Sequence, residues 1–119
     1  MQNGKKMRKK KTITILFDYL CCPVWAEYYD EETDTEYTGV KVVDVDEEVR
    51  RIAAEIESLF NSYYMFNVDG QPVVFNYEQE KKDKDKMLNL LGKLNRRLEE
   101  INDGSFTVVD KETPRVMNL

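Results

Sequence analysis

Two stretches of the sequence space their apolar residues three and four positions apart, and this spacing constrains the fold more than any other feature. Such spacing is typical of a helix with one apolar face. In residues 44–64 the apolar positions are Val49, Ile52, Ala53, Ile56, Leu59, Phe60 and Tyr63. In residues 80–101 they are Met87, Leu91, Leu94, Leu98 and Ile101. Both stretches predict helices that must bury this face against another part of the chain.

The ends of these helices carry their own signals. Asp44 followed by Glu47 three residues later has the capping-box arrangement, so Asp44 is the expected N-cap of the first helix. Gly104 can take the left-handed conformation that ends the second. The apolar steps of four and three in the second helix also resemble a coiled-coil seam. They last barely two heptads, so core packing on a sheet is the more ordinary interpretation.

Strand patterns surround the helices. Residues 12–20 alternate, with Ile13, Ile15, Phe17 and Tyr19 on one face. Asp69-Gly70 is a favoured two-residue turn, which predicts a hairpin with Tyr64 opposite Phe75 and Phe66 opposite Val73. A second, longer hairpin is expected around a tip at residues 30–34. The stretch "SFTVVD", residues 105–110, is the last expected strand.

The predicted order is three strands, a helix, a hairpin, a helix and a strand. This order indicates an α+β fold. We expect a mostly antiparallel sheet of about five to six strands with two helices packed on one face. Residues 12–113 are expected to form a single α+β domain. Residues 1–11 are interpreted as a flexible basic tail and residues 114–119 as a C-terminal tail.

The net charge of −5 conceals an uneven distribution. Residues 1–11 carry six basic and no acidic side chains, and the rest of the chain carries 12 basic against 23 acidic ones, a net charge of −11. A body this acidic should repel phosphate backbones and attract basic surfaces. We therefore expect no nucleic-acid partner, although contact of the basic tail with nucleic acid remains an alternative.

The start of the chain does not fit an export signal. Its apolar run from Ile13 to Phe17 is interrupted by Thr14 and stopped by Asp18, so it is too short for that purpose. The sequence also has no run of 18 apolar residues, the length expected of a membrane-spanning helix. We expect a cytoplasmic protein that does not contact membranes. Reduced thiols at the adjacent Cys21 and Cys22 agree with that compartment.

The sequence gives little support to catalysis or metal binding. It has no histidine, the usual general base and common metal ligand, and no glycine-rich phosphate-binding motif. Two adjacent cysteines do not make a zinc site without further strong ligands. The acidic run from Asp44 to Glu48 lacks the glycine and spacing of a calcium loop. We expect no enzyme, no cofactor and no metal site.

Aromatic and acidic residues alternate between positions 25 and 37. Tyrosine and tryptophan are common anchors of protein interfaces, and acidic neighbours suit a basic partner. The candidate partner-binding residues are Trp25, Glu27, Tyr28, Tyr29, Asp30, Glu31, Glu32, Asp34, Glu36 and Tyr37. The alternative interpretation is that the rings pack on the sheet and the acidic residues form a solvated hairpin tip.

The closing segment "RRLEEINDGSFTVVDKET" and the small, acidic, motif-free chain resemble the immunity proteins of bacterial toxin–immunity systems. These include the partners of contact-dependent growth-inhibition toxins. The resemblance implies tight binding and neutralisation of a basic toxin domain, often a nuclease, whose active site or substrate surface is covered. The alternative is a non-catalytic regulator or scaffold of a phage or mobile element. The oligomeric state is open, with a monomer favoured.

Overall fold

The computed structural model describes residues 11–25, 28–30, 35–66 and 72–119. For Trp25 and for residues 28–30, 35–37, 66, 72 and 73 it describes the backbone only. In chain order the elements are β1 (Lys11–Ile15), β2 (Val24–Trp25), β3 (Tyr28–Asp30), β4 (Thr35–Tyr37), α1 (Lys41–Asp44), α2 (Glu47–Asn61), β5 (Tyr64–Phe66), β6 (Pro72–Phe75), α3 (Tyr77–Lys82), α4 (Lys84–Ile101), β7 (Phe106–Asp110) and α5 (Glu112–Met117).

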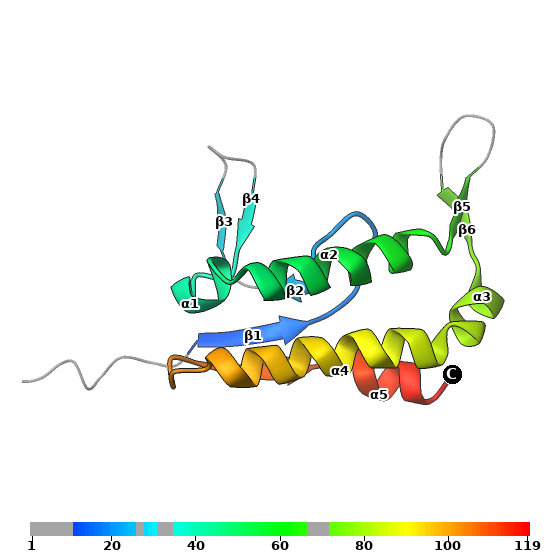
Figure 1. Ribbon diagram of the computed structural model, residues 1–119. Coiled ribbons are helices and arrows are strands. Elements are labelled where there is room, and N and C mark those ends of the chain that lie inside the picture. The colour runs from blue at the N-terminus through cyan, green and yellow to red at the C-terminus, as the bar shows by residue number, and fades with distance from the viewer. Residues whose placement is uncertain (1–10, 26–27, 31–34, 67–71) are drawn as a thin grey trace, which may run out of the picture.

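In the described parts of the chain, the strands form three separate small sheets. The largest has the order β2-β1-β7, while β3–β4 and β5–β6 are isolated hairpins (Figure 1). β1 and β2 are antiparallel, but β1 and β7 run parallel, from Lys11 opposite Phe106 to Ile15 opposite Asp110. The chain mixes helices and strands as expected of α+β proteins. The prediction of one mostly antiparallel sheet of five to six strands, with two helices on one face, is wrong. The strands of each hairpin pair with each other. The strand that pairs with β1 over its whole length is β7, which comes much later in the sequence.

The alternation of residues along β1 explains how the main sheet joins the core. Ile13 and Ile15 are fully buried, whereas Thr12 is exposed and Thr14 half-buried. Each fully buried side chain of this size contributes about 1.5–3 kcal/mol relative to exposure. The predicted strand 12–20 nevertheless ends at Ile15, because the chain then turns back toward β2. Leu16 N–H donates to the carbonyl of Pro23 at 3.0 Å, which closes the turn.

The helix α2 buries the face that the sequence predicts. Its buried residues are Val49, Ile52, Ala53, Ile56 and Phe60. The predicted N-cap, Asp44, is wrong. The cap is Asp46, whose Oδ2 accepts a hydrogen bond from Val49 N–H at 2.9 Å. Asp44 belongs instead to the short helix α1, which precedes the cap.

The second predicted helix, residues 80–101, is divided at Asp83 into α3 and α4. Met87, Leu91, Leu94 and Leu98 are buried in α4, and Leu90 widens the apolar face. α4 packs against α2 along its length, and Figure 1 shows the two helices side by side with β1. The buried face of α4 thus belongs to the core, as predicted, but its main partner is the helix α2 and not a sheet.

The β5–β6 hairpin follows the predicted register only at its base. Tyr64 lies opposite Phe75 as expected. A bulge between Met65 and Phe66 then places Phe66 opposite Pro72, so the predicted partner Val73 is wrong. The predicted turn, Asp69-Gly70, lies outside the described residues. The rings of Tyr64 and Phe75 pack on the ring of Phe60, with distances between ring centroids of 5.8 and 5.5 Å. These contacts attach the hairpin to α2.

The last residues of the chain are structured. Residues 114–119, expected as a tail, include most of α5, which packs against α4. Val116 is fully buried, and Leu119 packs against the core. The helix α5 therefore forms part of the hydrophobic core.

Candidate partner-binding surfaces

The predicted partner-binding residues cluster at the β3–β4 hairpin. Tyr28, Tyr29 and Asp30 form β3, and Glu36 and Tyr37 belong to β4. Tyr28 is opposite Tyr37, and Tyr29 is opposite Glu36. Trp25 lies in β2, opposite Thr14 of β1. The other four predicted residues, Glu27, Glu31, Glu32 and Asp34, lie outside the described residues.

The hairpin stands away from α2 and β1 but has a defined base (Figure 1). Thr38, directly after β4, donates to Asp44 Oδ1 through its backbone N–H at 2.8 Å and its hydroxyl at 2.7 Å. Gly39 has a φ of 77°, a conformation that glycine adopts without steric cost. Val40 N–H donates to the Thr38 hydroxyl at 3.1 Å. These bonds fix the direction in which the chain leaves β4.

A second surface runs between α2 and α4, which we call the α2–α4 groove. It has two adjoining parts that share Lys93, with volumes of about 710 and 500 Å³. The first part is lined by Asp46, Glu47, Glu48, Arg51, Ile52, Lys93, Arg96, Arg97 and Glu100. The second is lined by Glu55, Ser58, Leu59, Ser62, Lys86, Asn89, Leu90 and Lys93.

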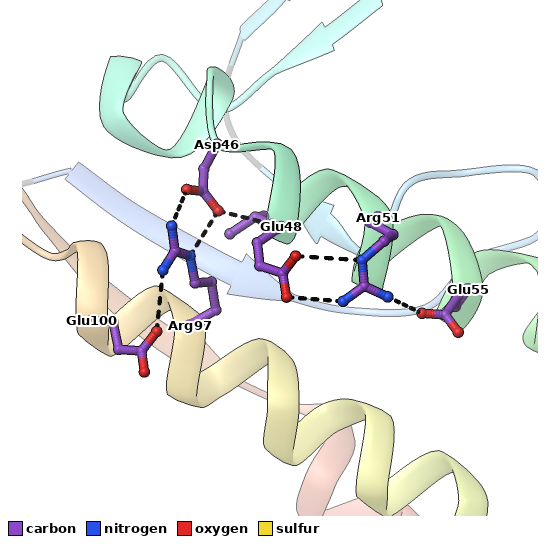
Figure 2. Close-up of polar contacts among 7 residues, drawn as sticks. Asp46, Glu48, Arg51, Glu55, Arg97 and Glu100 are labelled. Atoms are coloured by element: carbon purple, nitrogen blue, oxygen red, sulfur yellow. Dashed lines mark hydrogen bonds and ion pairs between the residues drawn. The ribbon is translucent and has the colours of Figure 1, made fainter.

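Figure 2 shows the ion pairs that cross and border this groove. Arg97 on α4 binds Asp46 at the start of α2 through Nε, at 3.0 Å, and Nη2, at 2.7 Å. Its third donor nitrogen contacts Glu100 at 3.2 Å. On α2, Arg51 lies between Glu48 and Glu55, at 2.9 and 3.0 Å.

The contact between Asp46 and Arg97 shifts the pKa values of both groups. Hydrogen bonding to Arg97 holds the pKa of Asp46 below its usual value, against an opposing effect of burial. The same contact raises the pKa of Arg97 further above its ordinary value. The side chain of Asp46 is only 11% exposed, so this pair is screened by solvent less than the pairs of Arg51. It ties the beginning of α2 to the end of α4.

This groove was not predicted from the sequence. The acidic residues from Asp44 to Glu48 were expected to serve the start of a helix, and the basic residues of α4 had no predicted role. The available signal was the spacing of Lys86, Lys93 and Arg97, seven and four residues apart, which places cations on one side of a helix. That side borders α2 because α2 and α4 pack against each other, a contact that the spacing within α4 does not encode.

A third cluster joins two buried carboxylates and the partly exposed Arg115 between α3, α5 and the segment that follows β1. Glu80 is 1% exposed and accepts from Arg115 Nη2 at 2.7 Å. Glu112, also buried, accepts from Arg115 Nε at 2.6 Å and from Phe17 N–H at 2.9 Å. Glu80 Oε1 has no hydrogen-bond partner among the described residues. The cluster joins three segments, and its position beneath the surface favours a structural role.

The described part of the chain offers little for metal or membrane chemistry. Within it, no group of three or more metal-ligating side chains is close enough to hold an ion. Nor does any helix in these segments have the length and apolar character needed to cross a membrane. Comparisons with protein-family models, with curated proteins and with solved structures found no match.

Proposed function

We propose that this chain is an immunity protein that binds a cognate basic toxin domain in the bacterial cytoplasm and neutralises it by covering its active site or substrate surface. The observation that carries the proposal is the β3–β4 hairpin. It projects from the body, and its register sets Tyr28 opposite Tyr37 within an acidic segment (Figure 1).

The hairpin combines two properties of protein interfaces. Residues directly opposite in an antiparallel pair belong to the same face of the sheet, so Tyr28 and Tyr37 share one face of this hairpin. Two tyrosines so placed offer rigid contact area at a low cost in conformational entropy. Tyr29 and Glu36 share the other face. An aromatic pair with acidic neighbours suits a basic protein surface.

The charge of the remaining body supports the same kind of partner. Beyond the first eleven residues the net charge is −11, which attracts a basic domain over a distance of about 10 Å at 0.1 M salt. The negative phosphates of nucleic acid attract a positively charged nuclease in the same way. An acidic protein that occupies its substrate surface therefore competes directly with the substrate.

The test uses the gene directly upstream, where a toxin gene lies in toxin–immunity systems. The C-terminal domain of its product is expressed in a laboratory bacterium with and without this chain. We expect the domain alone to stop growth and coexpression to restore it, with nanomolar affinity between the purified proteins. A domain that remains toxic in the presence of this chain would contradict the proposal and favour a regulator or scaffold.

A charge-neutralised hairpin locates the interface. The variant Asp30→Asn, Glu32→Gln, Glu36→Gln removes three negative charges. We expect its association rate with the toxin domain to fall about tenfold at low salt, with a smaller loss at high salt, because charge steers encounter.

The matched control removes three exposed acidic charges elsewhere. The control variant is Glu78→Gln, Asp85→Asn, Glu99→Gln. These residues form no ion pair within the described segments, so their loss tests net charge alone. Equal losses in both variants would mean that net charge, and not the hairpin, determines association.

A further inference from the structure

The two walls of the α2–α4 groove carry opposite charge. On α2, the exposed Glu47, Glu48 and Glu55 outnumber Arg51. On α4, the cations Lys86, Lys93, Arg96 and Arg97 outnumber Glu100. One acidic and one basic wall therefore run side by side along two antiparallel helices.

Within the described residues, most of the charge on the basic wall is not neutralised, whereas most of the charge on the acidic wall is. Across the described residues, no ion pair involves Lys86, Lys93 or Arg96 on the basic wall, or Glu47 on the acidic wall. Exposed arginine and glutamate pairs occur within the acidic wall, and Arg97 is held by Asp46. The remaining cations are exposed and aligned beside the groove.

Gly92 is a second, independent feature, which lies beside the residues that line the groove. It lies in the middle of α4, is exposed, and, apart from the nearby backbone of its own helix, no described atom lies within 4 Å of the position its Cβ would occupy. Glycine in a helix interior destabilises the helix relative to alanine, and packing within this chain does not require it here. It is one turn from Asn89 and from Arg96, which line the groove. A glycine at this position lets another helix approach α4 closely.

We propose that a second copy of this chain docks on the α2–α4 groove about a two-fold axis parallel to the helices. Two-fold axes in the plane of this face permit two arrangements. An axis perpendicular to the helices stacks α2 on α2 and brings the acidic walls together. An axis parallel to the helices places α2 of each copy over α4 of the other, so each acidic wall meets a basic wall. Charge selects the second arrangement.

This dimer differs from the monomer favoured by the sequence, and it does not depend on the toxin-binding proposal. None of the described residues that line the groove belongs to the β3–β4 hairpin, so we expect the hairpin to stay available to another partner. Because the contacts are charged and near the surface, the association should be modest and sensitive to salt.

The first test measures the mass of the full chain by sedimentation equilibrium at about 50 mM and at about 500 mM salt. The Debye length is longer than about 10 Å at the lower concentration and shorter at the higher one, so only the higher concentration screens the charges strongly. We expect a mass above the 14.1 kDa of one chain at low salt and a return toward that mass at high salt. A single-chain mass at low salt, up to about 1 mM protein, would overturn the proposal.

The decisive test mixes two charge-reversed variants, Glu55→Lys and Lys93→Glu. Each alone places like charges against each other twice in its dimer, so each should dimerise roughly tenfold more weakly. An equal mixture should form a heterodimer in which both contacts are again attractive. No gain in mass on mixing would overturn the arrangement. Glu78→Lys and Lys111→Glu, exposed charges outside the groove, should dimerise like the unchanged protein.

Gly92→Gln separates dimerisation from folding. Glutamine is a better helix former, so the thermal midpoint of the monomer at high salt should rise by roughly 4 °C. The larger side chain should block the approach of the second copy and weaken the low-salt dimer. A variant that is more stable but dimerises unchanged would overturn the close approach at α4, and with it the proposed face.

Discussion

Asp46 and Arg97 lie 51 residues apart in the chain and meet through two hydrogen bonds, of 2.7 and 3.0 Å. Asp46 Oδ2 also accepts from Val49 N–H, so one carboxylate caps α2 and holds the end of α4. Removing the carboxylate therefore removes the helix cap and the contact with Arg97, whereas removing the guanidinium leaves the cap and removes the contacts with Asp46 and Glu100.

We expect Asp46→Ala to lower the free energy of unfolding by about 2 kcal/mol, the sum of a lost cap and a lost ion pair. Arg97→Gln should cost only about 0.5–1 kcal/mol, because the cap remains and Arg97 is partly exposed to solvent. Urea titration of both variants measures the difference. Equal losses would show that the cap contributes nothing of its own.

The same pair predicts a dependence on pH. Since the folded pKa of Asp46 lies below its ordinary value of 3.8, the ionised carboxylate stabilises the fold above that value. This contribution is lost as the pH falls through the lower, folded pKa. Asparagine caps helices as well as aspartate does, so Asp46→Asn removes mainly the charge.

Unfolding free energies of Asp46→Asn and the unchanged protein should therefore differ at pH 7 and converge below pH 3.8. The comparison requires urea titrations at several pH values between these limits. A difference that persists undiminished in acid would mean that the charge of Asp46 is not its cause.

Arg115 serves two buried carboxylates, Glu80 and Glu112. Arg115→Met should lower the unfolding free energy by about 2 kcal/mol, because it leaves buried carboxylates without their cation. The value lies below that of a fully buried pair since the Arg115 side chain is 41% exposed. The double variant Glu80→Met, Arg115→Met should recover part of this loss, and a double variant less stable than Arg115→Met would contradict the account.

Leu20 has a φ of 59°, the left-handed region, and its side chain is 66% exposed. This backbone conformation costs roughly 1–2 kcal/mol for most residues, and asparagine tolerates it better. The N–H of Leu20, which donates to Asn61 Oδ1 at 3.0 Å, is retained in any such variant. Leu20→Asn should therefore raise the unfolding free energy by up to about 1 kcal/mol.

Thermal unfolding measures this gain. The control is Val45→Asn, since Val45 is exposed to a similar degree but has a φ of −94°. We expect no stabilisation there. If both variants gained equally, lower surface hydrophobicity would explain the effect and relief of backbone strain would not.

The sequence predicted what short-range periodicity determines. The buried faces of α2 and α4 follow from residues three and four apart, and Tyr64 opposite Phe75 follows from the spacing around a turn. The bulge at Met65 was not predictable, because no residue type there signals an extra position in the strand. Alternation in residues 12–15 identified the strand but not its partners.

The features missed are those that depend on distant neighbours. The parallel pairing of β1 with β7 joins residues 95 positions apart, from Lys11 opposite Phe106 onward, and no local pattern encodes it. Burial of Glu80 depends on α5, whose Arg115 contacts it from 35 residues away, and the α2–α4 groove depends on the packing of two helices that are separate in the sequence. The segment of residues 25–37 was expected as a binding surface, and that assignment stays a prediction.

The pairing of β1 with β7 also sets the order in which the protein can be completed during synthesis. β1 is made among the first residues, yet its long neighbour, Phe106–Asp110, leaves the ribosome after every helix except α5. Until then Ile13 and Ile15 belong to a strand paired only with the two residues of β2. Each helix can form early because its backbone hydrogen bonds join residues four positions apart. The main sheet closes only when translation has passed residue 110. A chain that stalls before that point therefore exposes a strand edge with unpaired backbone N–H and C=O groups to chaperones and proteases.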